Sequence, residues 1–244
     1  ILKFFLILMD ISNLIFNEVL ITQKLIRCDS PSRVILKDDF FTSSAILFSI
    51  IPYENKPYEL ILIHRTNKGT RHRGEMSFPG GKFEPNLDKS LKETALRETE
   101  EEIGVKRESI KIIGCLDDFP TMTKYIITPF VGLINKDQKL VKDNREVQEI
   151  VKIPIDFFIK KKNFREQAVD IDGNKFPIFY FNYIKKENGK KFTIWGATAY
   201  MISNFIESVY SYNLSKMGLQ RFKLDKIKLI KEYIKYRNQI TKDF

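Results

Sequence analysis

Hydrophobic and polar positions along the chain predict strands that alternate with helices. Apolar runs of strand length, bounded by turn residues, lie at 43–51, 59–64, 110–116, 125–133, 176–183 and 191–195. Apolar positions with helical spacing predict helices at 10–27, 91–103, 196–212 and 222–240. The last two strands flank Glu187-Asn188-Gly189, which predicts a hairpin. The interleaved order predicts a layered α/β fold.

The helix at 91–103 has the clearest ends. Ser90 and Glu93 match a capping box, in which a hydroxyl and a carboxylate satisfy free backbone N–H groups of the first turn. Gly104 stands where helices commonly end in a left-handed residue. Both ends of this helix are therefore predicted from local sequence.

The pattern divides the chain into an N-terminal helical extension at 1–42, a central domain at 43–212 and a basic C-terminal helix at 213–244. The apolar stretch near the N-terminus is interrupted by Lys3 and Asp10, so it is too short to span a bilayer. It also lacks the small-residue cleavage site of a signal peptide. We therefore expect an intracellular protein, cytoplasmic or organellar (mitochondrial, for example), and neither a secreted nor a membrane-spanning one.

Charge and cysteine content narrow the classes of partner and compartment. The chain has 41 Lys and Arg against 31 Asp and Glu, a net charge of +10, which favours an anionic partner such as a phosphate-bearing small molecule, a nucleic acid or an acidic membrane surface. Two cysteines, Cys28 and Cys115, are too few for a disulfide framework or a four-thiolate zinc site, and fit a reducing compartment.

Three carboxylates share one side of the helix at 91–103. At about 100° per residue, Glu98, Glu101 and Glu102 fall on one arc beside the apolar stripe, while Glu93 and Glu100 point the opposite way. Like charges at the edge of a buried face repel one another, and a hard divalent cation relieves that repulsion. Oxygen ligands favour Mg²⁺ or Mn²⁺ over zinc. The alternative interpretation is a solvated acidic helix face.

The stretch RETEEEIG at 97–104, preceded by Gly81, resembles the Nudix box, a loop–helix–loop signature of hydrolases that act on a diphosphate linked to another moiety. The resemblance implies an α/β/α sandwich with a mixed sheet between helices. It also implies that Glu98, Glu101 and Glu102 bind Mg²⁺ or Mn²⁺ and that Arg97 pairs with a carboxylate to hold the helix.

The chain departs from the usual Nudix box at three points. Fifteen residues separate Gly81 from Arg97, two more than usual, and Thr99 takes a place that is normally hydrophobic. Lys89 stands where the box has a glutamate, and Asp88 is the nearest substitute.

Further stretches resemble the coenzyme A diphosphatase branch of that family. They are Arg65 followed by HRGE at 72–75 and FPGG at 78–81, then residues 116–131 and IWGATA at 194–199. The similarity covers about 43–205, although Thr70 replaces one usual arginine. It implies hydrolysis of coenzyme A or acyl-CoA to adenosine 3′,5′-bisphosphate and 4′-phosphopantetheine or its acyl form.

Residues around the loop before the helix are candidates for binding the substrate. Arginine offers a bidentate fork to phosphate, and glycine lets the backbone approach a metal–phosphate cluster. On these grounds the candidate substrate contacts are Arg65, His72, Arg73, Gly80, Gly81 and Lys82. The alternative is that the charges are solvated loop residues and the glycines form a simple turn.

The sequence leaves the general base and the aromatic contacts open. Glu75, Glu146 and Glu149 are base candidates by position. Trp195 and Phe78 could stack on an adenine or line a pantetheine channel, although packing in the core is the favoured interpretation for both.

Two other functions compete with coenzyme A hydrolysis. One is a Nudix hydrolase for a different nucleoside diphosphate derivative, such as ADP-ribose, a dinucleotide or capped RNA. The other is a non-catalytic domain that binds a nucleotide or RNA through the basic C-terminal helix; the intact Glu98, Glu101 and Glu102 argue against it. We expect a small diphosphate, coenzyme A first, as the partner, and not a nucleic acid; no oligomeric state is favoured.

Overall fold

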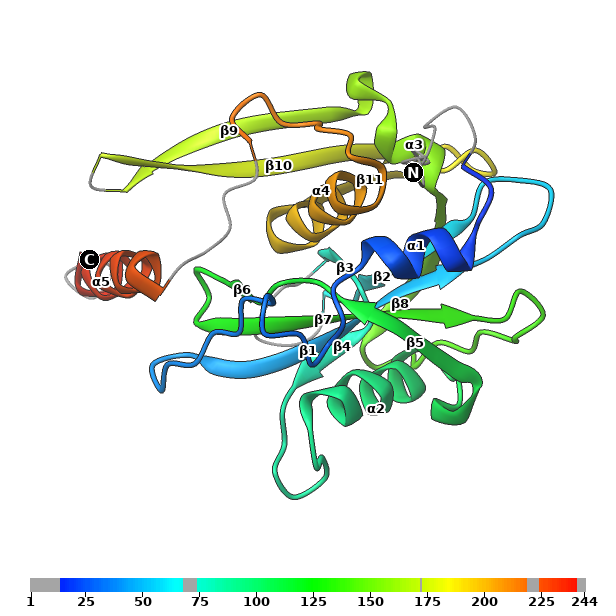
Figure 1. Ribbon diagram of the computed structural model, residues 1–244, viewed down its shortest axis with the longest axis horizontal. Helices are drawn as coiled ribbons and strands as arrows, with labels where there is room; N and C mark the ends of the chain where they lie inside the picture. Colours follow the sequence, from blue (N-terminus) through cyan, green and yellow to red (C-terminus); the bar gives the residue numbers. More distant parts are fainter. Residues whose placement is uncertain (1–13, 68–73, 172, 219–223, 241–244) are drawn as a thin grey trace, which may run out of the picture.

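A long strand, β1 (Thr42–Ile51), runs through the middle of the fold in the computed structural model (Figure 1). Its last eight residues are buried without alternation, which means that both of its faces are covered. The structure describes residues 14–67, 74–171, 173–218 and 224–240.

Helices and strands alternate along the rest of the chain. In chain order they are α1 (Glu18–Lys24), β2 (Glu59–Arg65), β3 (Met76–Ser77), β4 (Gly80–Lys82), α2 (Leu91–Ile103), the 3₁₀ turn η1 (Arg107–Ser109), β5 (Ile110–Cys115), β6 (Phe119–Pro120), β7 (Tyr125–Ile134), β8 (Val147–Pro154), α3 (Ile155–Ile159), the 3₁₀ turn η2 (Lys161–Asn163), β9 (Phe164–Ile171), β10 (Asn174–Ile184), β11 (Lys191–Trp195), α4 (Gly196–Tyr210) and α5 (Leu224–Ile240).

The strands around β1 form a mixed sheet. Among the described residues, eight strands make this sheet, with the path β3-β2-β1-β7-β5 and with β4, β6 and β8 added to β1, β7 and β2. Strand β1 is parallel to β7 over a register that runs from Thr42↔Tyr125 to Ile50↔Leu133, and antiparallel to β2 and β4. The predicted mixed sheet is confirmed.

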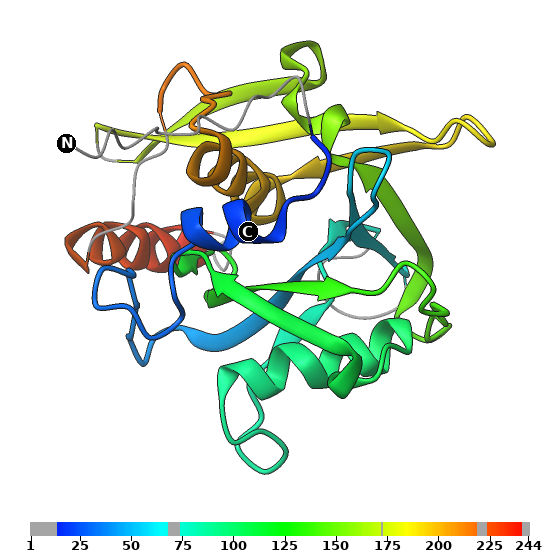
Figure 2. The same cartoon turned by 45° about the vertical axis from the view of Figure 1, so that its right-hand side comes forward.

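Helices cover both faces of this sheet (Figures 1 and 2). Phe48 of β1 stacks on Phe205 of α4 at a centroid distance of 4.6 Å, so α4 packs on one face. Leu47 belongs to a second core cluster with Ala95 and Ile103 of α2 on the opposite face. The predicted α/β/α arrangement is confirmed, and burial on two faces explains why β1 has no charged residue.

A second, three-stranded sheet lies on the far side of α4 (Figure 1). Phe179 of β10 stacks with Tyr200 of α4, their rings 6.0 Å apart. The predicted hairpin is confirmed as β10 and β11, with Gly189 at φ +69° in its turn. Strand β9, which completes this sheet, was not predicted because its sequence, FREQAVDI, lacks an apolar run.

The N-terminal helix is shorter than the predicted 10–27. Asn17 caps α1 by accepting the Leu20 N–H at 3.1 Å, and the helix ends at Lys24. After it, Leu25 is drawn into the core and Ile26 forms a backbone bridge with Cys115. These contacts need an extended chain, so the helix ends before the predicted boundary at residue 27. The first part of that prediction, including the apolar start of the chain, lies outside the described residues.

The C-terminal helix predicted at 222–240 is present as α5. It buries Ile227, Ile230 and Ile234 in a cluster with Phe41 and Phe176. In the part of the chain that the structure describes, no helix combines the length and the apolarity that crossing a membrane requires.

The two cysteines form a disulfide, contrary to what their small number suggested. Cys28, after α1, bonds to Cys115 at the end of β5, with Cα atoms 5.0 Å apart and a sequence separation of 87. The disulfide ties the N-terminal segment to the sheet. Cysteine usage therefore no longer supports the inference of a reducing compartment.

We expect the disulfide to stabilise the fold, since it removes conformational freedom from a long loop of the unfolded chain. Replacing both cysteines with serine should lower the free energy of unfolding by about 2 to 4 kcal/mol in urea titrations. In strong reductant, which opens the disulfide, the native protein and the double variant should have the same free energy of unfolding. Two titratable thiols in the denatured, unreduced protein would contradict the disulfide.

Candidate active site

The acidic helix α2 begins and ends as the sequence predicts. Ser90 caps it by accepting the Glu93 N–H at 3.3 Å, and Glu93 in return accepts the N–H of Lys89, one residue earlier than in the standard capping box. Gly104 ends it in the left-handed conformation at φ 72°. These caps fix where each glutamate of the helix lies on its surface.

Arg97 of α2 forms a buried ion pair with Asp88 in the preceding loop. Arg97 Nε and Nη2 donate to the two Asp88 oxygens at 2.8 and 3.0 Å. The Asp88 carboxylate also accepts from the Thr94 hydroxyl and the Glu84 N–H. The hydrogen bonds from Arg97 lower the pKa of Asp88 to about 2. Asp88 thus pairs with Arg97 in place of the glutamate that Lys89 replaces, as we inferred.

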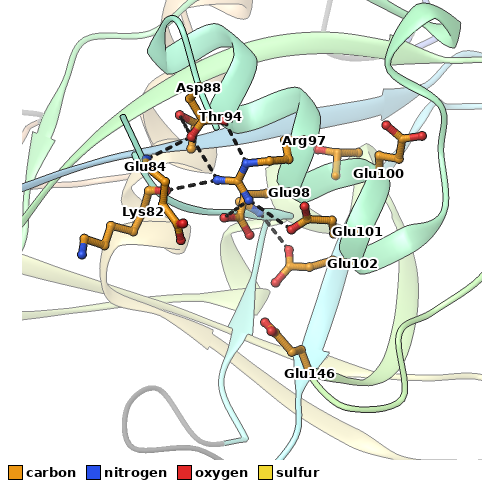
Figure 3. A network of polar contacts seen from close by, with 12 residues as sticks. Lys82, Glu84, Asp88, Thr94, Arg97, Glu98, Glu100, Glu101, Glu102 and Glu146 are labelled. Atoms are coloured by element: carbon orange, nitrogen blue, oxygen red, sulfur yellow. Dashed lines mark hydrogen bonds and ion pairs between the residues drawn. The ribbon is translucent and has the colours of Figure 1, made fainter. Parts of the chain in front are cut away.

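The outer nitrogen of the same guanidinium reaches two of the predicted metal ligands. Arg97 Nη1 lies 2.9 Å from an oxygen of Glu98 and 3.0 Å from an oxygen of Glu101. Figure 3 shows Glu98, Glu101 and Glu102 on one side of α2, with Glu146 beyond them, while Glu100 is turned away. The predicted grouping of the three carboxylates on one arc is therefore present.

Glu102 is the most enclosed of these carboxylates. It is 2% exposed, and its oxygens accept from Arg65 Nη1 and from the Gly80 N–H, each at 2.9 Å. Arg65 also contacts Glu146 at 3.4 Å. Burial raises the pKa of Glu102 to about 8 and also raises the pKa of Glu98, with further repulsion from Glu146 at both. The site is short of positive charge for the number of carboxylates that it gathers.

Glycine is required beside this cluster. A Cβ at Gly81 would lie 2.4 Å from the Glu98 carboxyl carbon, well inside van der Waals contact. At Gly80 a Cβ would lie 2.4 Å from the Ala45 carbonyl oxygen. The paired glycines therefore let strand β4 pass directly under the carboxylates.

The donor set fits a hard divalent cation. Carboxylate oxygens are the ligands that Mg²⁺ and Mn²⁺ prefer, and burial of Glu98 and Glu102 makes added positive charge favourable. As the side chains stand, Arg65 and Arg97 contact these oxygens, and no three acidic, histidine or cysteine side chains of the described residues converge closely enough to enclose an ion. Glu98, Glu101 and Glu102 are the residues that would hold the cation.

Comparison with known proteins identifies the family of this site. The family model described as "NUDIX domain" matches residues 44–170, which is more than half of the chain and includes α2 and its carboxylates. The chain belongs to the Nudix family.

Three curated relatives show how far the likeness extends. The chain is 32% identical over 158 residues to Nudix hydrolase 15, mitochondrial, of Arabidopsis thaliana, covering 64% of this chain and 54% of that protein. It is 29% identical to the uncharacterized Nudix hydrolase NudL of Photorhabdus laumondii, covering 66% and 82%. It is 28% identical to the peroxisomal coenzyme A diphosphatase NUDT7 of Mus musculus, covering 64% and 65%. The chain thus spans little more than half of the Arabidopsis relative.

Some of the predicted substrate contacts lie beside the carboxylates of α2 and others do not. Arg65 contacts the carboxylates, and Gly80 and Gly81 lie beside them. The Lys82 side chain points away from the carboxylates in Figure 3, and its carbonyl oxygen accepts from Arg97. The prediction for His72 and Arg73 falls outside the described residues.

The three candidates for the general base lie in different parts of the structure. Glu146 lies against Arg65 beside the Nudix helix carboxylates. Glu149 is held by Lys185 and Lys190 of the β10–β11 hairpin, each at 2.6 Å, so its oxygens are used in joining the two sheets. Glu75 contributes its backbone carbonyl, which accepts the Arg65 N–H.

The two aromatic candidates have opposite roles. Phe78 is buried and packs 4.4 Å from Phe48, so the core interpretation is confirmed for it. Trp195 is 42% exposed and lies beside Tyr180, so the core interpretation is wrong for it. Sequence reasoning missed Tyr180; the register of the predicted hairpin, which places it opposite Trp195, is the signal that could have found it.

Replacing Asp88 should destabilise the Nudix domain, because the buried Arg97 would lose the carboxylate that accepts two of its hydrogen bonds. We expect Asp88→Asn to lower the free energy of unfolding by about 2 to 3 kcal/mol at neutral pH. The pKa of Asp88 lies below its unfolded value, so the contribution of the carboxylate is complete above about pH 4 and is lost as pH falls toward 2. Urea titrations from pH 7 downward should show the difference shrinking over that window.

Asp29→Asn is the matched control, since Asp29 makes a similar two-point pair with Arg27 at the surface. Exposed pairs contribute little, so this change should leave the free energy of unfolding almost unchanged. Equal effects of the two substitutions would contradict the role of the buried pair.

Proposed function

We propose that the chain is a metal-dependent hydrolase that cleaves the diphosphate bond of coenzyme A or acyl-CoA, releasing adenosine 3′,5′-bisphosphate and 4′-phosphopantetheine or its acyl form. The observation that carries the hydrolase proposal is the carboxylate cluster at α2, held by Arg97, Arg65 and the Gly80 N–H. The coenzyme A proposal is supported by the likeness to the mouse coenzyme A diphosphatase and by the motifs at 72–81 and 194–199.

The residues of the site divide the work of hydrolysis between them. A bound Mg²⁺ or Mn²⁺ would supply positive charge at the phosphoryl oxygens and make the attacking water more acidic. Glu98, Glu101 and Glu102 would hold it. The Gly80 N–H orients the Glu102 carboxylate, and the missing side chain of Gly81 leaves room for Glu98.

Arg65 and Glu146 are placed to act on the substrate itself. The Arg65 side chain is 27% exposed and lies between Glu102 and Glu146, so its guanidinium can turn to a phosphate with bidentate geometry. Glu146 has an exposed carboxylate on the same side of the cluster and is our choice for taking the proton of the attacking water.

Another nucleoside diphosphate derivative is the second candidate substrate. The chain is as similar to the Arabidopsis and Photorhabdus relatives as to the mouse enzyme, and the names of those two specify no substrate. ADP-ribose, a dinucleotide or capped RNA would place the same diphosphate at the carboxylates.

A substrate panel tests both levels of the proposal. Free coenzyme A, dephospho-coenzyme A, an acyl-CoA, ADP-ribose and a dinucleotide are incubated with Mg²⁺ or Mn²⁺ in labelled water, and products are identified by mass spectrometry. We expect 4′-phosphopantetheine from coenzyme A, one labelled phosphate and no turnover with chelator. Turnover of ADP-ribose alone would contradict the coenzyme A assignment, and no turnover of any compound would contradict the hydrolase proposal.

Removing one metal-binding carboxylate should abolish turnover. We expect Glu102→Gln to lower kcat at least a hundredfold, since the change keeps volume and removes a negative charge at the ion. Glu100→Gln is the control on the same helix: Glu100 pairs with Lys106 and Arg107 away from the cluster and should keep full activity. Circular dichroism verifies folding, and an unchanged rate in Glu102→Gln would contradict the role of Glu102 in hydrolysis.

A further inference from the structure

A cavity of about 500 Å³ lies between the two sheets, close to the carboxylates. One wall comes from β2 and β3, and the other from β10 and β11. The Thr198 hydroxyl of α4 donates to the Met76 carbonyl of β3 at 3.1 Å, which joins the two walls. The volume is in the range that holds a small-molecule ligand.

The cavity and the carboxylates meet at the same end of β2. His64 lines the cavity, and Arg65, the next residue, contacts Glu102. Successive side chains of a strand point to opposite faces, so His64 and Arg65 face opposite sides of the sheet at this end of β2. A molecule that passes round the end of β2 can place its diphosphate at Glu102 and its non-reacting part in the cavity.

Two aromatic rings are stacked on one another in the wall of the cavity. Tyr180 and Trp195 are direct cross-strand partners, their ring centroids are 6.3 Å apart and their planes differ by 9°. Trp195 keeps 42% of its surface exposed although the chain has a core large enough to bury it. An exposed aromatic face beside a phosphate-binding site suits the stacking of a base.

The polar groups of the cavity suit a nucleotide better than an aliphatic chain. Lys191 lies in the same wall as Trp195. Nδ1 of His64 is buried and has no hydrogen-bond partner among the described residues. A buried ring nitrogen in this state is a place for a ligand hydrogen bond.

We propose that this cavity binds the nucleobase of the substrate, stacked on the exposed face of Trp195, with the Tyr180 ring on the other side of the indole. The assignment rests on the proposed function in one respect: it takes the reacting diphosphate to lie at the carboxylates of α2. It makes Trp195 and Tyr180 determinants of specificity that do not take part in bond cleavage.

Trp195 is the single tryptophan of the chain, so its fluorescence reports binding directly and without turnover. In the presence of chelator, the protein is titrated with ADP, with ribose 5-phosphate and with 4′-phosphopantetheine, with excitation at the red edge of the indole band. We expect saturable quenching by ADP and none by the two compounds that lack a base. Quenching by 4′-phosphopantetheine but not by ADP would overturn the assignment.

Kinetics test the same assignment through activity. Trp195→Leu and Tyr180→Leu should each raise KM about tenfold for a nucleotide substrate and leave kcat within about twofold, because the lost stacking acts on binding alone. Trp195→Phe, which keeps an aromatic face, should recover most of the affinity. Tyr236→Leu is the control, since Tyr236 is an exposed aromatic residue on α5, and it should change neither constant.

The two proposals fail in different ways. A protein that hydrolyses diphosphates but shows no quenching by ADP and no change of KM in Trp195→Leu overturns the base site and leaves the proposed function intact. A protein that hydrolyses nothing but is quenched saturably by ADP overturns the proposed function and supports the base site.

Discussion

The ion pair between Asp88 and Arg97 determines how the acidic helix α2 and its loop are arranged. Both side chains are almost fully buried, and a charge at that depth is tolerated only with its partners in place. Arg97 therefore holds Asp88 in place, and Asp88 in turn accepts hydrogen bonds from the Thr94 hydroxyl and the Glu84 N–H. The nitrogen left over on Arg97 points to Glu98 and Glu101. One buried charge pair thus positions both the loop and the carboxylates.

Much of the fold could be predicted because several elements carry a strong local signal. The strand β1 has an apolar run broken only by Ser49 after Ser44, and α2 has a hydroxyl cap at one end and glycine at the other. By contrast, β8 (VQEIVKIP) and β9 (FREQAVDI) mix charges with apolar residues, and their strand conformation comes from pairing with β2 and β10. The two-residue strands β3 and β6 exist only through their partners, and a linear pattern cannot express that.

The candidate site was predictable where its residues lie on one element. Glu98, Glu101 and Glu102 follow from helical spacing alone. The contact of Arg65 with Glu102 and the bond between Cys28 and Cys115 join residues that are 37 and 87 positions apart, so only the folded chain brings them together. The exposure of Trp195 has the same origin, because it depends on how β11 lies against β3.

The second sheet is fastened to the first at a point that has no part in the proposed reaction. Glu149 of β8 forms ion pairs with Lys185 and Lys190, which flank the turn of the β10–β11 hairpin. The Thr198–Met76 hydrogen bond ties α4, on which the second sheet packs, to β3 of the first sheet. The cavity between the sheets is therefore preformed. A ligand that fits it would bind with little loss of conformational entropy in the protein.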